Sequence, residues 1–156
     1  MRYIIQPEKD GIQFGDYLDA LNSYRHLLPV EVAEFASDED RYVLTHPSSL
    51  HDAWVEQISV TESRDVDGAS SRIGVALRLL GQMHDRHIIL TYENVSNYSI
   101  SGGENQWSTH QTLHGDVFTH EVRVSDCGRV VHEIAVGEAG KIEITCATFN
   151  VEEREP

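Results

Sequence analysis

The sequence predicts an α+β fold in which N-terminal helices pack on an antiparallel meander sheet of about six strands. Two observations support this prediction. Hydrophobic residues recur every three to four positions within residues 1–46, and every two positions within residues 50–150. The chain contains no low-complexity segment and no linker composition, so we expect one domain over residues 1–156.

The first third of the chain has the spacing of amphipathic helices. One stripe is formed by residues three or four positions apart, namely Phe14, Leu18, Leu21, Arg25 and Leu28. Pro29 ends this helix and suits the start of a second one, because proline is tolerated in the first helical turn. The second helix is expected over the apolar residues 30–36, before the acidic turn 37–40.

From residue 50 onward, short segments rich in β-branched residues are separated by Gly, Asp and Asn, which is typical of an antiparallel meander. The expected strands are Trp54–Val60, Ile73–Leu79, His87–Tyr92, Phe118–Val124, Val130–Val136 and Ile142–Cys146. In the fourth of them, alternation places Phe118 and His120 on the same face. The polar interval 99–114 is expected to be a loop, and residues 152–156 a solvated tail.

Two turns set the expected register of the last three strands. A two-residue turn at 127–128 and a three-residue turn at 138–140, with its final glycine left-handed, keep apolar faces together. In this register His132 lies opposite Cys146, and His120 is diagonally adjacent on the same face.

The predicted register gathers two imidazoles and a thiol. His120, His132 and Cys146 would lie within side-chain reach, since cross-strand neighbours are about 4.5–8 Å apart. Two imidazoles and a thiolate suit zinc, so these residues form the candidate metal or proton-handling site. The alternative is that they are ordinary members of a half-buried sheet face, because the sequence offers no evident fourth ligand.

A second group of residues consists of His51-Asp52 and the segment from His84 to His87. The His51-Asp52 dipeptide resembles the signature of HD phosphohydrolases, in which adjacent His and Asp bind metal on an all-helical scaffold. The strands expected after residue 50 disagree with that scaffold, so a structural role at a strand entry explains the dipeptide better. A metal-dependent hydrolase is therefore kept as an alternative function, with a site drawn from His51, Asp52, His84, His87, His120 and His132.

The chain is strongly acidic, with 26 Asp and Glu against 12 Lys and Arg and a formal net charge of −14. Such a field repels phosphate backbones and anionic lipid headgroups, so neither nucleic acid nor a membrane is an expected partner. A basic protein partner fits the charge, and so does solubility alone. Trp107, in the polar interval, is the candidate residue for contact with a partner, and exposed sheet edges would permit a homodimer.

The segment from Ser49 to Ile58 contains Leu50-His51-Asp52 directly before the first expected strand. It resembles small uncharacterised bacterial β-rich proteins, some of which are similar to immunity proteins encoded beside toxins. The resemblance implies an immunity or antitoxin-like role and transfers no functional residue. Since nucleophile-elbow, Walker A and zinc-protease motifs are absent from the sequence, we expect a non-enzymatic binding protein. A small-molecule-binding module is a further alternative.

The sequence also carries information about the compartment. The N-terminus has no signal-peptide pattern, and no stretch approaches the roughly 18 apolar residues of a transmembrane helix. The two cysteines form no disulfide framework. We therefore expect a cytoplasmic protein with no cofactor other than the zinc considered above.

Overall fold

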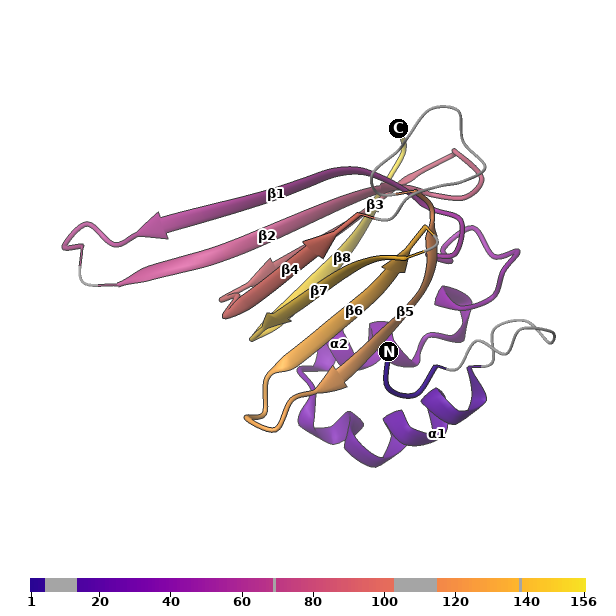
Figure 1. Ribbon diagram of the computed structural model, residues 1–156, viewed down its shortest axis with the longest axis horizontal. Coiled ribbons are helices and arrows are strands. Elements are labelled where there is room, and N and C mark those ends of the chain that lie inside the picture. The colour runs from indigo at the N-terminus through magenta and orange to yellow at the C-terminus, as the bar shows by residue number, and fades with distance from the viewer. Residues whose placement is uncertain (5–13, 69, 103–114, 138) are drawn as a thin grey trace.

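The computed structural model describes residues 1–4, 14–68, 70–102, 115–137 and 139–156. These residues contain the helices α1 (Gly15–Tyr24) and α2 (Val30–Ser37) and eight strands (Figure 1). The strands are β1 (Trp54–Arg64), β2 (Ser71–Leu80), β3 (His87–Glu93), β4 (Asn97–Ser101), β5 (Val117–Val124), β6 (Val130–Val136), β7 (Gly140–Cys146) and β8 (Thr148–Arg154). They form two antiparallel four-stranded sheets, in the orders β1-β2-β3-β8 and β4-β7-β6-β5.

The α+β class and the N-terminal helices are confirmed, whereas the single meander sheet of six strands is wrong. The meander is divided into β1-β2-β3 in the first sheet and β5-β6-β7 in the second. The remaining strands were not predicted: β4 overlaps the start of the expected loop, and β8 ends inside the expected tail. Their side chains are mainly polar, but their backbones pair with β7 and β3. Polar composition therefore concealed two strands that complete the two sheets.

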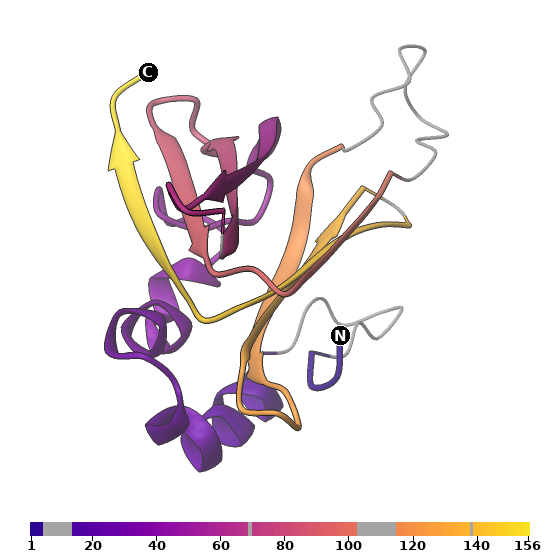
Figure 2. The ribbon, with the colours of Figure 1, turned by 90° about the vertical axis from the view of Figure 1, so that its left-hand side faces the viewer.

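The two sheets are joined by a bent ribbon of four strands. β3 leads almost directly into β4, and β7 into β8. At the bend, the Ser96 amide donates to the Thr145 carbonyl at 2.8 Å, and the Ala147 amide donates to the Glu93 carbonyl at 3.1 Å. Figure 2 shows the two sheets diverging from this bend, with the helices on one side of the second sheet and the N-terminus on the other.

Both helices bury an apolar face, but in α1 it departs from the predicted stripe, of which Leu18 is half-buried and Arg25 exposed. Tyr17 and Leu21 of α1 are buried, and so are four residues of α2, namely Val32, Ala33, Phe35 and Ala36. Phe35 meets the ring of Phe149 on β8 edge-on, with 5.2 Å between centroids. In the described part of the chain, neither helix is long and apolar enough to cross a membrane.

The predicted register is correct at the first turn. Val122 pairs with His132 across β5 and β6, as expected. The turn itself has three residues, 126–128, because Ser125 and Arg129 still form a backbone pair across it. A two-residue turn would have placed Val122 opposite Glu133, so the expected pairing is confirmed while the expected turn length is wrong.

The register at the second turn is wrong by two residues. Gly137 (φ 54°), rather than Gly140, takes the left-handed conformation, and Val136 pairs with Gly140. A Cβ atom on Gly140 would lie 2.7 Å from Val136, so this close pairing requires glycine. A shift of two residues leaves every side chain on its original face, and the hydrophobic pattern therefore could not reveal it.

A β-bulge in β5 corrects a further prediction. Val117 pairs with Val136 and Thr119 with Ala135, which leaves Phe118 as the extra residue. Phe118 is therefore 40% exposed, while His120 is buried. The prediction that both side chains share one face is wrong, because the bulge interrupts the alternation.

Candidate functional site

The structure brings two of the three predicted zinc ligands together in the core. His132 Nδ1 lies 2.8 Å from the Tyr92 hydroxyl, and His132 Nε2 lies 3.2 Å from His120 Nδ1. Phe149 stacks on His132, with 5.1 Å between centroids, and Tyr42 stacks on His120, with 4.5 Å. These rings come from β3, β5, β6, β8 and the segment after α2, so they link both sheets to the helical part.

Burial keeps both imidazoles neutral. It lowers the pKa of His120 to about 3. Burial and the neighbouring His120 lower the pKa of His132 well below its usual range. Within the described residues, His120 Nε2 has no hydrogen-bond partner, so the hydrogen-bonded chain ends there. A proton added to either ring at mildly acidic pH would be a poorly solvated buried charge.

Cys146 does not complete a metal site with these histidines. It pairs with Val130 rather than with His132, because β7 is displaced by two residues. Burial raises its pKa to about 12, so the side chain is a thiol, whereas zinc binds the thiolate. Both ring nitrogens of His132 are already hydrogen-bonded. In the part of the chain that the structure describes, no three His, Cys, Asp or Glu side chains are arranged to hold a metal ion. The geometry therefore gives no support to zinc at this site.

The second predicted group partly converges at the surface. His51 Nδ1 lies 2.7 Å from the Phe118 carbonyl oxygen, and its Nε2 lies 3.4 Å from Asp52 Oδ1. The ring of His84 contacts Trp54 at 4.5 Å between centroids. His87 is not part of this contact group, and its Nε2 pairs instead with Glu56 at 3.1 Å.

Asp116 is the residue of this surface group that the sequence analysis missed. It forms an isolated antiparallel bridge with Trp54, which links the start of β1 to the start of β5. Burial and the nearby Asp52 carboxylate raise the pKa of Asp116, and His51 and His84 act in the opposite direction. Asp52, His51 and His84 therefore all affect the pKa of Asp116, although no sequence motif identifies this residue.

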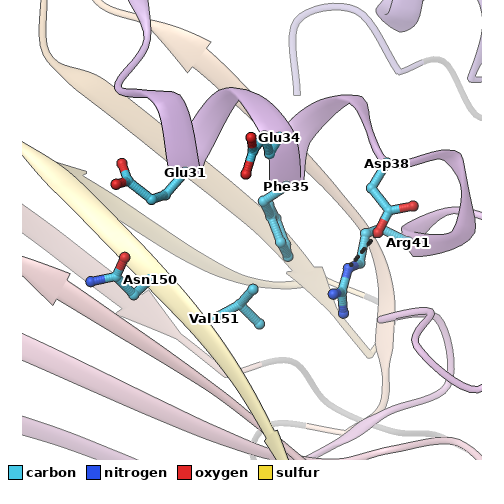
Figure 3. Close-up of a pocket in the computed structure, with 7 residues that line it drawn as sticks. All are labelled: Glu31, Glu34, Phe35, Asp38, Arg41, Asn150 and Val151. Atoms are coloured by element: carbon cyan, nitrogen blue, oxygen red, sulfur yellow. Dashed lines mark hydrogen bonds and ion pairs between the residues drawn. The ribbon is translucent and has the colours of Figure 1, made fainter.

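A hollow of about 500 Å³ lies between α2 and β8 (Figure 3). In Figure 3, Phe35 projects from α2 toward Val151, and Glu31 lies across from Asn150. The complete lining is Glu31, Glu34, Phe35, Asp38, Arg41, Asn150 and Val151. The hollow thus combines an aromatic ring with three carboxylates.

Arg41, the cation of this hollow, is already neutralised. Its Nε lies 3.2 Å from Asp38 Oδ2, and its Nη1 lies 2.7 Å from Glu153 Oε1. Glu31 and Glu34 are exposed, and neither forms a salt bridge with another described residue. The hollow consequently presents uncompensated negative charge to solvent.

The fold and these surfaces define an acidic α+β protein built on two four-stranded antiparallel sheets. The chain matches no protein-family model, and no curated protein is similar to it in sequence. The resemblance to immunity proteins therefore stays a prediction. Trp107, the predicted partner contact, lies outside the described residues.

Proposed function

We propose that the protein is a non-enzymatic binding protein with a basic protein partner, in an immunity or antitoxin-like role. The observation that carries this proposal is the acidic hollow between α2 and β8. Glu31 and Glu34 line it without a compensating cation among the described residues, in a chain of net charge −14. Electrostatic steering would speed the encounter with a basic partner, and the hollow would receive one of its cationic side chains.

Arg41 illustrates what the hollow accepts. Its guanidinium carbon lies 5.3 Å from the centre of the Phe35 ring, while its edge pairs with Asp38. A guanidinium from a partner would find carboxylates farther along α2, at Glu31 and Glu34, whereas the Phe35 ring is buried and already contacts Arg41. Guanidinium groups suit carboxylates because their planar edge can donate two parallel hydrogen bonds. We therefore expect arginine to be preferred over lysine.

The double variant Glu31→Gln and Glu34→Gln is expected to weaken binding of a hexa-arginine peptide about tenfold at low ionic strength, because two exposed attractive charges are lost. Isothermal titration calorimetry gives the affinity, and amide chemical shifts locate the peptide. Signals of Asn150 and Val151 are expected to move in the unmodified protein.

The matched control removes the same charge elsewhere, through Asp67→Asn and Glu93→Gln, which are also exposed. If binding depends only on net charge, both double variants weaken it equally. That result would contradict the hollow as the binding site.

A metal-dependent hydrolase is the second candidate, favoured by the surface contact of His51 with Asp52. The Phe118 carbonyl can only accept, so His51 Nδ1 carries the hydrogen, as is common for metal-bound histidine. The 3.4 Å between His51 Nε2 and Asp52 Oδ1 matches the spacing of about 3.3 Å between two ligands of tetrahedral zinc. The described residues place no third donor there, which ranks this function second.

Zinc titration tests the second candidate. A hydrolase site predicts one zinc ion bound per chain at about micromolar affinity or better, and loss of that binding in the His51→Ala variant. Weaker binding, or equal binding by the variant, removes the hydrolase. The hollow of Figure 3 gives no support to a small-molecule-binding module with an apolar pocket, because charged side chains form most of its lining.

A further inference from the structure

A second surface, which shares no residue with the lining of the hollow, combines exposed aromatic rings with carboxylates. We define the Trp54 patch as Asp52, Trp54, His84, Asp116 and Phe118. Trp54 is 48% exposed and Phe118 is 40% exposed, which is high for side chains of this size. Trp54 contacts His84 and pairs with Asp116, while His51 links Asp52 to Phe118. The members therefore form one surface around the bridge that links the start of β1 to the start of β5.

The backbone at the patch is unusual. Asp52 (φ 58°) and His84 (φ 55°) occupy the left-handed region, which residues other than glycine adopt uncommonly. The bulge turns Phe118 outward, and its carbonyl is fixed at 2.7 Å from His51 Nδ1. Strain and a bulge in neighbouring segments are features that folded proteins retain where a surface is used.

The chemistry of the Trp54 patch favours a cation. The indole of tryptophan is the strongest of the aromatic faces for cations, Asp116 pairs with Trp54 across the bridge, and Asp52 lies near enough to Asp116 to raise its pKa. The two carboxylates also repel each other, as the effect of Asp52 on Asp116 shows. A guanidinium placed between them would relieve this repulsion while it stacked on Trp54. Exposed tryptophan surrounded by polar groups is also the usual composition of an interface hot spot.

We propose that the Trp54 patch is a docking surface for an arginine-bearing segment of a protein partner. This inference rests on the proposed function, since it concerns the same basic partner. It adds a second anchoring point, in which an aromatic face provides the main contact rather than the glutamates of α2.

The test follows the indole N–H signal of Trp54 by NMR while hexa-arginine is added to the full chain. The Trp54→Phe variant assigns this signal, because its indole N–H is lost. We expect the signal to shift in a saturable manner, and the Trp54→Leu variant to weaken binding roughly fivefold. Hexa-lysine is expected to shift the signal less, since ammonium does not stack.

A second variant tests the carboxylates without removing a ring. Asp52→Asn with Asp116→Asn keeps the side-chain shapes, and asparagine tolerates the left-handed conformation at position 52. We expect this double variant to reduce the hexa-arginine-induced shift of the Trp54 indole signal. The control, Asp19→Asn with Asp67→Asn at two exposed positions outside the patch, is expected to reduce that shift less.

The outcomes separate this inference from the proposed function. If hexa-arginine moves Asn150 and Val151 but leaves the Trp54 indole unchanged, the docking surface is refuted and the hollow stands. If it moves neither group of signals, both proposals fail. A Trp54 shift that persists in the Glu31→Gln and Glu34→Gln variant supports the patch as an independent anchor.

Discussion

Lowering the pH from 6.5 to 4.5 is expected to reduce the free energy of unfolding by roughly 5 kcal/mol, because His120 and His132 cannot be protonated in the folded state. In the unfolded chain both imidazoles should titrate near their ordinary pKa of about 6.5. Below that pH the unfolded chain binds protons that the native state excludes, and each histidine contributes about 1.4 kcal/mol per pH unit.

The sign follows from the lowered pKa values. Stability is fully present above pH 6.5, and it falls with decreasing pH until His120 itself is protonated in the folded state, near its pKa of about 3. Carboxylates add to acid unfolding only at the lower end. The pKa values of Glu133 and Glu153 lie below their usual 4.5, because neighbouring cations outweigh the effect of burial. The pH range from 6.5 to about 5 therefore isolates the histidines.

Urea unfolding at a series of pH values measures this slope, and ring carbon shifts of the histidines give an independent readout. We expect His120 and His132 to keep the shifts of neutral imidazole until unfolding begins. An unchanged free energy of unfolding between pH 6.5 and 5 would show that the two buried rings accept protons in place.

The buried histidines also show how far hydrophobic patterning can predict structure. Alternation in β5 and β6 correctly placed His120 and His132 on one face, because a buried face excludes a one-residue slip. The same argument failed for Cys146, since a slip of two residues preserves the face and only turn geometry distinguishes the registers. The predicted zinc site required the correct register of β7, which the hydrophobic pattern does not determine.

The surface sites depended on information that no local pattern contains. Asp116 joins His51, Asp52 and His84 through one isolated bridge between β1 and β5, which are far apart in the sequence. The hollow between α2 and β8 requires β8, whose charged end at 152–154 has the composition of a solvated tail. Glu153 of this strand is half-buried and pairs with Arg41 and Arg86, but only the tertiary fold brings these partners together.

Replacing Glu121 with Gln is expected to destabilise the protein by roughly 3 kcal/mol, which is a large effect for a single polar substitution. Glu121 is fully buried on the face of the second sheet opposite His120. Its carboxylate accepts the backbone N–H groups of Arg2 at 3.1 Å, Tyr3 at 2.8 Å and Ile4 at 3.1 Å. Glutamine has one acceptor oxygen, and its NH₂ group would face these donors.

An opposing effect has to be weighed against this loss. Glu121, Glu133 and Glu143 lie opposite one another on three adjacent strands, and like charges in such a row repel. Neutralising Glu121 would relieve part of the repulsion. Arg123 already compensates the row, with its guanidinium 3.8 Å from Glu121, 3.3 Å from Glu133 and 3.5 Å from Glu143. The three hydrogen bonds to the buried carboxylate contribute about 1.5–3 kcal/mol each. They therefore outweigh the repulsion within the row, which Arg123 largely offsets.

Glu143→Gln is the matched control, because it neutralises the same row at a side chain that is 24% exposed and that, within the described parts of the chain, bonds only to Arg123 and Lys141. We expect this control to change the free energy of unfolding by less than about 1 kcal/mol. Urea unfolding compares the two variants, and amide hydrogen exchange at Tyr3 and Ile4 reports whether the N-terminal residues have detached. Equal stability of the two variants would mean that charge relief in the row balances the lost backbone bonds. Protection of Tyr3 and Ile4 that survives in Glu121→Gln would show that these residues are held by their apolar contacts instead.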